Sequence, residues 1–179
     1  MELSAGCKGK EQEVIDLLSA AFAASEGAEE GALIGDLVRN LLATTADADI
    51  HVFTVREERS LIGAIIFSRL TYDQDDRTVF LLGPVGVTTD RQGARIGQRL
   101  LTHGISALRK NGVDVAMTYG DPNYYSKVGF RPVTEEFARA PFKLKYPKGW
   151  LGQFLTDGKM TPLNGPSRCV EAFHRPDYW

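Results

Sequence analysis

Cysteine is scarce in this 179-residue sequence, which contains only Cys7 and Cys169, far apart and without a CxxC spacing. This scarcity argues against a disulfide framework and against a zinc cluster. Excess charge is also missing, because 21 Lys and Arg residues stand against 23 Asp and Glu residues. Proteins that bind nucleic acid usually have a strongly basic surface, so nucleic acid is not expected as the main partner.

Long hydrophobic runs are absent as well. Runs such as Leu61–Phe67 are far shorter than the roughly 20 residues that cross a bilayer. The first residues have no basic head followed by an apolar stretch. We therefore expect a soluble, cytoplasmic protein with no membrane partner. Hydrophobic residues still make up 43% of the sequence and charged residues 25%, which fits one globular domain over residues 1–179.

The first half of the chain predicts two helices followed by an antiparallel meander. Apolar residues at helical spacing predict helices over Glu11–Ala24 and Glu29–Ala43. Segments rich in β-branched and aromatic residues then predict three strands. These strands are Ile50–Arg56, Leu61–Leu70 and Thr78–Thr88.

The second half predicts a strand–helix–strand unit and hence an α/β fold with layers. Helical spacing returns over Gln92–Lys110, and Asn111-Gly112 is a good stop signal. The elements expected next are a strand at Val113–Tyr119, a short helix at Pro122–Val128 and a strand that starts at Phe130–Val133. Residues 137–179 are rich in Pro and Gly and are expected to form an irregular C-terminal extension, with Cys169–Phe173 as a candidate last strand.

The segment from Leu82 to Gly97 is the most informative for function, because a strand runs into a turn with glycine and then into a helix. Free N–H groups and the positive end of the helix dipole make a helix start a ready anion site. Nearby basic residues are Arg91, Arg95 and Arg99. The alternative is an ordinary helix start capped by Thr89 or Asp90. The spacing excludes two other phosphate loops, GxxxxGK[ST] and GxGxxG after a first strand.

This turn resembles the [Gln/Arg]-x-x-Gly-x-[Gly/Ala] motif of GNAT-type N-acetyltransferases, in which it binds the pyrophosphate of acetyl-CoA. Gln92 and Gly97 match its first and last positions. Arg95 stands where the family usually has glycine, and an arginine there could add a charge-assisted contact. The resemblance implies acetyl-CoA as the cosubstrate.

A second segment, Gly120–Phe130, resembles the Tyr-x-x-x-Gly-Phe motif that closes the cofactor site in the same family. Tyr125, Gly129 and Phe130 fit this motif. The fuller GDPNYYSKVGF sequence, the strand letters LGPVGV and the late FHRPDYW are similar to the YhbS-like bacterial subgroup. The resemblance covers roughly Glu11–Phe130 and, more loosely, the C-terminal end.

The resemblance implies a mixed, mostly antiparallel central sheet, flanked by helices and splayed between its fourth and fifth strands, with the cofactor in the gap. Pro84 and Gly86 suit a strand that bulges where the splay begins. No metal site is expected. The expected cofactor-binding residues are Val85, Gly86, Val87, Gln92, Gly93, Ala94, Arg95, Ile96, Gly97, Asn123, Tyr124 and Tyr125.

The implied reaction is direct transfer of an acetyl group from acetyl-CoA to a primary amine of a small acceptor. A backbone N–H near Val85–Val87 would stabilise the developing oxyanion. Tyr125 would protonate the departing thiolate, with Tyr124 as its rival. Two other interpretations stay open: a CoA-binding regulatory module that transfers nothing, and an acyltransferase that uses longer acyl-CoA or a hydroxyl acceptor.

The general base and the walls of the acceptor site are not identified by the motifs. An alkylamine with a pKa of about 10.4 is mostly protonated at neutral pH, so a base or a water chain is needed. The histidines lie outside both motifs; His51 and His174 are expected to be structural, and His103 to face solvent. Candidates for the acceptor mouth are Glu26, Glu29 and Glu30, whose alternative is a solvated acidic patch. Candidates for its walls are Phe142, Trp150, Leu151 and Phe154, whose alternatives are the core or a homo-oligomer contact.

Overall fold

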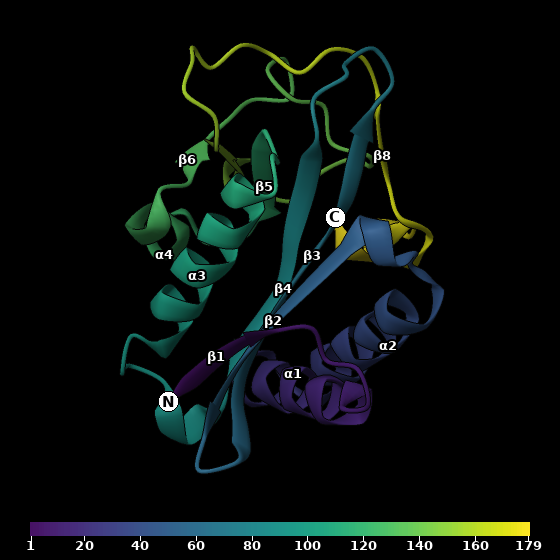
Figure 1. Cartoon of the computed structure of the whole chain (residues 1–179). Helices are drawn as coiled ribbons and strands as arrows, with labels where there is room; N and C mark the ends of the chain where they lie inside the picture. The colour runs from purple at the N-terminus through teal and green to yellow at the C-terminus, as the bar shows by residue number, and fades with distance from the viewer.

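The computed structural model describes residues 1–179 and has an eight-stranded sheet at its centre (Figure 1). The strands are β1 (Glu2–Ala5), β2 (Ile50–Glu57), β3 (Ser60–Tyr72), β4 (Val79–Val87), β5 (Val115–Tyr119), β6 (Arg131–Pro132), β7 (Trp150–Phe154) and β8 (Ser167–Cys169). Their order is β1-β2-β3-β4-β5-β7-β6, and β8 pairs with β3 off this path. The pair β4–β5 is parallel and the other pairs are antiparallel, so the predicted mixed sheet is confirmed.

Helices cover both faces of this sheet (Figure 1). They are α1 (Glu11–Glu26), α2 (Ala28–Thr44), α3 (Ile96–Lys110) and α4 (Pro122–Tyr125). Figure 1 shows α1 and α2 together on one side of the strands and α3 on the other. None of the helices combines the length and the apolar character that a bilayer span requires.

Alternation along the strands supplies one apolar surface to each helical layer, because successive side chains of a strand point to opposite faces. Ile65, Phe67 and Leu82 belong to the cluster that contains the buried face of α3. Ile66 and Leu81 belong to the cluster that contains the buried faces of α1 and α2. The sheet therefore separates two hydrophobic cores, and the period of two in the sequence decides which core each residue joins.

The β4 and β5 strands pair only from Val79–Leu82 to 115–118, and they have no further pairing beyond that point. At the same level, the register between β3 and β4 shifts, which leaves Gly83 and Pro84 opposite the single residue Ile66. This confirms the predicted bulge and splay. The hydroxyl of Thr118 donates to the carbonyl oxygen of Leu82 at 3.0 Å, where the two strands part.

The C-terminal segment 137–179 differs from the expected irregular extension. Its strand β7 lies inside the sheet, between β5 and β6, and β8 pairs with the end of β3. The candidate strand Cys169–Phe173 is wrong beyond its first residue, because Glu171–Phe173 forms a 3-10 turn. Short strands such as β7 and the unpredicted β1 carry little periodicity of their own, and their neighbours in the sheet determine them.

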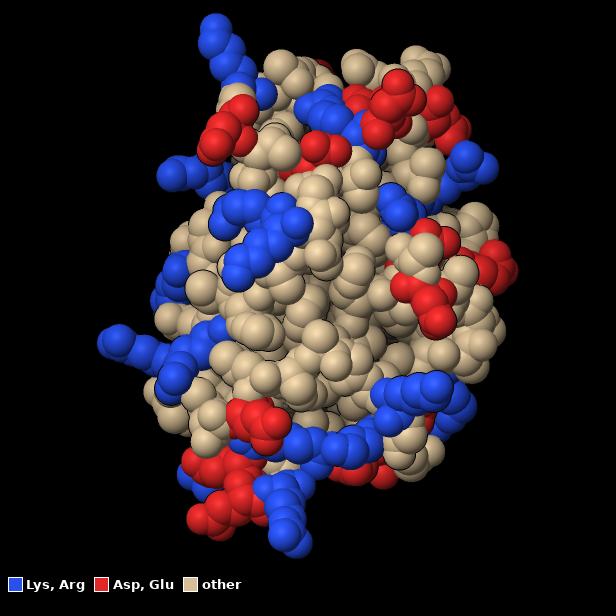
Figure 2. Space-filling model, in the orientation of Figure 1, with Lys and Arg blue, Asp and Glu red and all other residues tan.

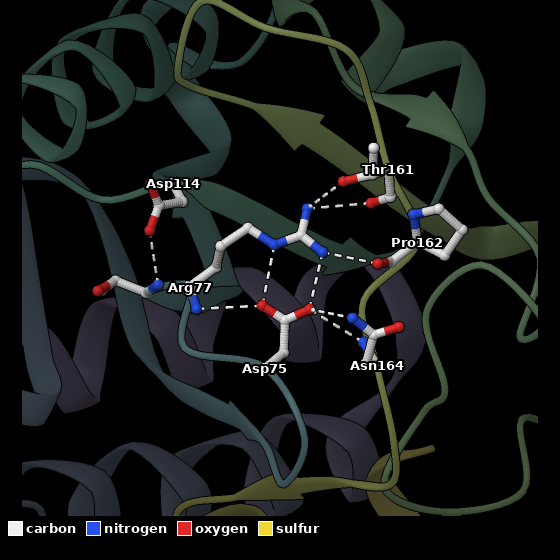
Figure 3. A network of polar contacts seen from close by, with 7 residues as sticks. Asp75, Arg77, Asp114, Thr161, Pro162 and Asn164 are labelled. Atoms are coloured by element: carbon white, nitrogen blue, oxygen red, sulfur yellow. Dashed lines mark hydrogen bonds and ion pairs between the residues drawn. The ribbon is translucent and has the colours of Figure 1, made fainter.

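A network of polar contacts holds this C-terminal segment against the β3–β4 loop (Figure 3). The Arg77 guanidinium donates to both carboxylate oxygens of Asp75, at 2.9 and 2.7 Å. It also donates to the carbonyl oxygens of Thr161 at 3.0 Å and Pro162 at 2.6 Å. The backbone and side-chain amides of Asn164 donate to Asp75 at 3.1 and 3.2 Å. We call these five residues the Asp75–Arg77 clamp; it fixes the chain that leads to β8 and the C-terminal turns.

Charges of both signs are mixed on the surface. On the face shown in Figure 2, acidic and basic side chains are interspersed at the upper and lower ends. Between these ends the centre is largely uncharged, with basic side chains toward the left edge and acidic ones toward the right. Several ion pairs of the protein are exposed, as with Arg39 and Asp36, whose side chains are 54% and 63% exposed. Exposed pairs of this kind contribute about 0–1 kcal/mol each, so the folding free energy comes mainly from the two cores.

Candidate active site

A cleft of about 900 Å³ opens where β4 and β5 part. Its walls are the end of β4, the turn before α3, the tyrosines of α4 and the last turn of α1. Ten of the predicted cofactor residues line it: Val85, Gly86, Val87, Gln92, Gly93, Arg95, Ile96, Gly97, Tyr124 and Tyr125. Two do not, since Ala94 and Asn123 are exposed outside the lining.

The turn before α3 presents free backbone amides to this cleft. The helix was expected from Gln92 but begins at Ile96, because Gly93 and Arg95 have positive φ values of 83° and 59° that break the helical path. No side chain caps α3. The alternative of a helix start capped by Thr89 or Asp90 is therefore wrong; those residues form a separate 3-10 turn. The unsatisfied N–H groups of the first helical turn remain available to an anion.

Two side chains of the turn have distinct tasks. The amide nitrogen Nε2 of Gln92 donates to the carbonyl oxygen of Val87 at 3.2 Å, which ties the turn to the end of β4. Arg95 holds a left-handed conformation, which costs a residue other than glycine about 1–2 kcal/mol. This backbone geometry suits the glycine that the resembling motif usually has at that position.

Basic side chains give the cleft its charge. Arg91, Arg95 and Lys127 line it. Arg91 forms an ion pair with Glu57, whereas Arg95 and Lys127 have no carboxylate partner. The predicted contributor Arg99 lies outside the lining. Two uncompensated cations beside free amides favour a ligand with negative charge.

The second motif folds as predicted at α4. The carboxylate of Asp121 accepts from the backbone N–H of Asn123 at 2.9 Å, and Pro122 occupies the first helical turn. The backbone N–H of Phe130 donates to the carbonyl oxygen of Tyr125 at 3.2 Å, so the turn at Gly129 folds back on the helix. Local hydrogen bonds therefore fix the two tyrosines.

The two motifs touch each other through Tyr124 and Gly97. A Cβ atom at Gly97 would collide with the hydroxyl of Tyr124, so only glycine allows this approach without a shift of the tyrosine. Tyr124 and Tyr125 lie edge to face, with ring centroids 5.1 Å apart. Tyr124 therefore covers the first turn of α3, whereas the ring of Tyr125 lies beside Gly120.

Tyr125 lies at the parting of β4 and β5. Burial raises its pKa above the usual value, and nearby Tyr124 raises it further, while a hydrogen bond with the Thr118 side chain has the opposite effect. Burial also raises the pKa of Tyr124. Because the hydroxyl of Thr118 donates to Leu82, its oxygen lone pairs are free to accept a hydrogen bond from the Tyr125 hydroxyl. A phenol with a raised pKa stays protonated at neutral pH.

A second cavity of about 310 Å³, which we call the side pocket, adjoins the cleft. The two cavities share Phe22, Glu26, Val85, Tyr119 and Tyr125. Of the rival tyrosines, Tyr125 lines both cavities and Tyr124 lines the cleft alone. A molecule in the cleft and another in the side pocket would thus meet at Val85 and Tyr125.

The acidic and apolar residues predicted for an acceptor site are only partly found in the side pocket. Glu26 and Glu30 line it and Glu29 does not. The proposed apolar walls were wrong: Trp150 and Leu151 are fully buried in the cores, and Phe142 and Phe154 pack beside them. The C-terminal residues that do line it are Phe173, Asp177, Tyr178 and Trp179. Their segment, FHRPDYW, is notable in the sequence only for its resemblance to the YhbS-like subgroup. No local spacing places these residues in a pocket, because the clamp and the sheet bring them there.

No histidine lines either cavity. His51 packs edge to face on Phe80, with ring centroids 4.9 Å apart, and burial lowers its pKa. His103 was expected to face solvent but is half-buried, with its ring 5.7 Å from that of Phe53. Histidine is thus not the source of a general base at this site.

Comparison with known sequences finds similar proteins that are N-acetyltransferases. The N-acetyltransferase YjhQ of Escherichia coli strain K12 is 31% identical over 141 residues, which cover 76% of this chain and 77% of YjhQ. The N-acetyltransferase YhbS of the same strain is 28% identical over 74 residues, or 41% of this chain and 44% of YhbS. No protein-family model matches the chain.

Solved structures share the fold. The crystal structure of the GNAT family N-acetyltransferase YhbS from Escherichia coli, in complex with CoA, has a TM-score of 0.78 at 20% identity and covers 97% of this chain and 92% of that one. A GNAT family acetyltransferase from Brucella melitensis, in complex with acetyl-CoA, has a TM-score of 0.70 at 24% identity, with 96% and 97% covered.

Proposed function

Because the chain belongs to the GNAT family of N-acetyltransferases, we propose that it transfers an acetyl group from acetyl-CoA, bound in the cleft, to a primary amine held in the side pocket. One observation carries this proposal: the two cavities meet at Val85, on the strand that leads into the first motif, and at Tyr125 of the second motif. Lining residues are drawn from Ala21 through Trp179, which supports one acyl-CoA N-acyltransferase domain over residues 1–179.

The turn at Gln92–Gly97 would hold the pyrophosphate of acetyl-CoA. Its free amides provide hydrogen-bond donors, and Arg95 and Lys127 provide unpaired positive charge. The pantetheine arm would lie along Val85–Val87, whose side toward β5 has no strand partner. Tyr124 would close the cleft over the first turn of α3, while the exposed Asn123 is left out of this site.

Tyr125 would act as the general acid. In the reaction, the amine nitrogen forms a bond to the acetyl carbon and the carbon–sulfur bond breaks. The phenol proton of Tyr125 would pass to the departing thiolate, and the tyrosine would regain a proton from solvent before the next turnover. A backbone N–H near Val85 would stabilise the transient oxyanion. Its position in both cavities favours Tyr125 over Tyr124 for this task.

The amine must also lose a proton before or during attack. Glu26 is the one carboxylate that lines both cavities, so it is the candidate base, acting through water. The amine proton would pass to Glu26 and then to solvent. Glu26 is exposed at the end of α1, which lets it exchange that proton freely.

Thiol release on mixing acetyl-CoA with a panel of primary amines tests the proposal, together with calorimetric titration of CoA. We expect saturable CoA binding and release of one thiol for each amide formed. Failure to bind CoA would reject the proposal. Binding without turnover of any amine would instead favour the regulatory module, and faster turnover of longer acyl-CoA would correct the acyl group.

A further inference from the structure

The side pocket differs from the cleft in both polarity and charge. Hydrophobic residues make up 11 of its 16 lining residues. Its charged residues are Glu26, Glu30 and Asp177, and it has no basic lining residue. A ligand that fits this pocket therefore meets an apolar wall and negative charge.

Aromatic side chains form much of the apolar wall. Phe22 comes from α1, Tyr119 from β5, and Phe173 and Trp179 from the C-terminal segment. The rings of Tyr119 and Trp179 are stacked, with centroids 6.4 Å apart. Trp179 is 2% exposed, and its indole N–H donates to the carbonyl oxygen of Phe173 at 3.0 Å. Contacts among these aromatic residues therefore hold the wall in place without a ligand. A volume of about 310 Å³ lies at the small end of ligand sites, which suits a body of one ring or a short chain.

The charge of the pocket is only partly compensated by the protein. Asp177 pairs with Arg175 at 2.8 Å. Glu26 and Glu30 pair with no cation of the chain. A carboxylate or phosphate on the ligand would find no cation among the lining residues and would be repelled by these groups. A protonated amine would be attracted.

We propose that the side pocket selects a small primary amine that carries an apolar body, aromatic or short aliphatic, and that bears no carboxylate or phosphate. This inference rests on the proposed function, because it takes the side pocket as the acceptor site. The apolar body lies against Phe22, Tyr119 and Trp179. The ammonium is drawn by Glu26 and Glu30, and its nitrogen reaches the shared region at Tyr125.

Three probe amines separate the two requirements. 2-Phenylethylamine has the apolar body alone, phenylalanine adds a carboxylate, and glucosamine replaces the apolar ring with a hydroxylated one. We expect 2-phenylethylamine to bind the CoA-loaded protein in calorimetry and to have a kcat/KM at least about ten-fold above that of either other amine. Equal or better use of phenylalanine or glucosamine would overturn the inference, as would no binding of 2-phenylethylamine.

Variants on α2 test the role of charge. Glu30→Gln should raise the KM for 2-phenylethylamine by about three- to five-fold and leave the Kd of CoA unchanged. Glu29→Gln is the matched control, because Glu29 is the adjacent residue, is exposed and lines neither cavity. Glu30→Lys should reduce the ratio of kcat/KM for 2-phenylethylamine to that for phenylalanine. Identical amine KM values in Glu30→Gln and the wild type would contradict the electrostatic part.

The two levels of inference fail differently. Loss of the acetyltransferase proposal would show as no binding of CoA to the wild-type protein, or as CoA binding without turnover of any amine. Loss of the specificity inference alone would show as normal CoA binding and acetylation, with phenylalanine or glucosamine preferred.

Discussion

The cleft and the side pocket share one boundary but are built in different ways. The cleft is formed by two short motifs whose backbone geometry is local: the turn with Gly93 and Arg95, and α4 with its Asp121 cap. The side pocket is formed by helix ends and by a C-terminal segment held from far away by the Asp75–Arg77 clamp. Local motifs thus define where acetyl-CoA would bind, while distant packing defines which amine would reach it.

The sharpest test of the shared boundary is Tyr125→Phe. Removing the phenol proton should lower kcat by about 10²-fold and leave the Kd of acetyl-CoA unchanged, because general acids typically contribute 10²–10⁴ in rate. Tyr124→Phe is the matched control and should retain most of kcat. Both values come from steady-state thiol release and calorimetry. A larger kcat loss in Tyr124→Phe would exchange the roles of the two tyrosines.

The clamp tests whether the side pocket depends on distant contacts. Asp75→Asn removes a carboxylate that is 5% exposed and accepts two hydrogen bonds from the Arg77 guanidinium. The guanidinium, 25% exposed, then has no ionic partner, so we expect a loss of roughly 2–4 kcal/mol in unfolding free energy. The KM for the amine should rise more than the Kd of CoA. Asp73→Asn is the control, because its pair with Arg168 is exposed and worth about 0–1 kcal/mol.

The same variant has a pH dependence of known sign. Hydrogen bonds from Arg77 lower the pKa of Asp75 below its usual range. A lowered folded-state pKa contributes stability above the unfolded pKa of about 3.9, and this contribution is lost as pH falls through the folded-state pKa. Denaturant unfolding should therefore show the difference between wild type and Asp75→Asn above about pH 4 and a shrinking difference below it. A difference that grows in acid would contradict the ion pair.

Arg95 tests whether charge or backbone geometry matters more in the cleft. Arg95→Gly should relieve the left-handed strain. The free energy of unfolding should rise by up to about 1 kcal/mol, which a higher melting temperature would show. Arg95→Ala keeps the strain and removes the charge, so it is the matched control. Both should weaken CoA equally if the guanidinium binds it. Unchanged CoA affinity in both variants would show that the Arg95 guanidinium does not contribute to CoA binding.

The smallest effect is an expected absence of change in the pH profile. Because the pKa of Tyr125 is raised above the usual value of about 10, the acid stays protonated throughout the working range. The profile of kcat should therefore have no decline due to this residue below about pH 10. A decline near pH 9 that disappears in Tyr125→Phe would show that the environment of the phenol is different.

The sequence predicted the cleft far better than the side pocket. The physical reason is that the cleft depends on contacts between residues close in the chain, whereas the side pocket depends on contacts between distant ones. The bulge at Gly83-Pro84 and the cap at Asp121 follow from residues next to each other in the chain, whereas the splay beyond Leu82 was implied by the family resemblance. Phe173 and Trp179 lie in a C-terminal segment that long-range hydrogen bonds hold in place, such as those from Arg77 to Thr161 and Pro162, and no local spacing encodes these bonds. The predicted start of α3 was too early because Arg95 has a left-handed conformation, which an arginine in the sequence does not indicate.

The approach of Tyr124 to Gly97 links two positions that a mutational library would normally vary one at a time. A methyl group at position 97 needs space that the phenol hydroxyl occupies. Alanine at 97 should thus be tolerated best together with phenylalanine or a smaller residue at 124. Homologues with alanine at the last position of the turn are expected to show compensating change in the partner motif, which makes this pair a diagnostic for aligning distant sequences.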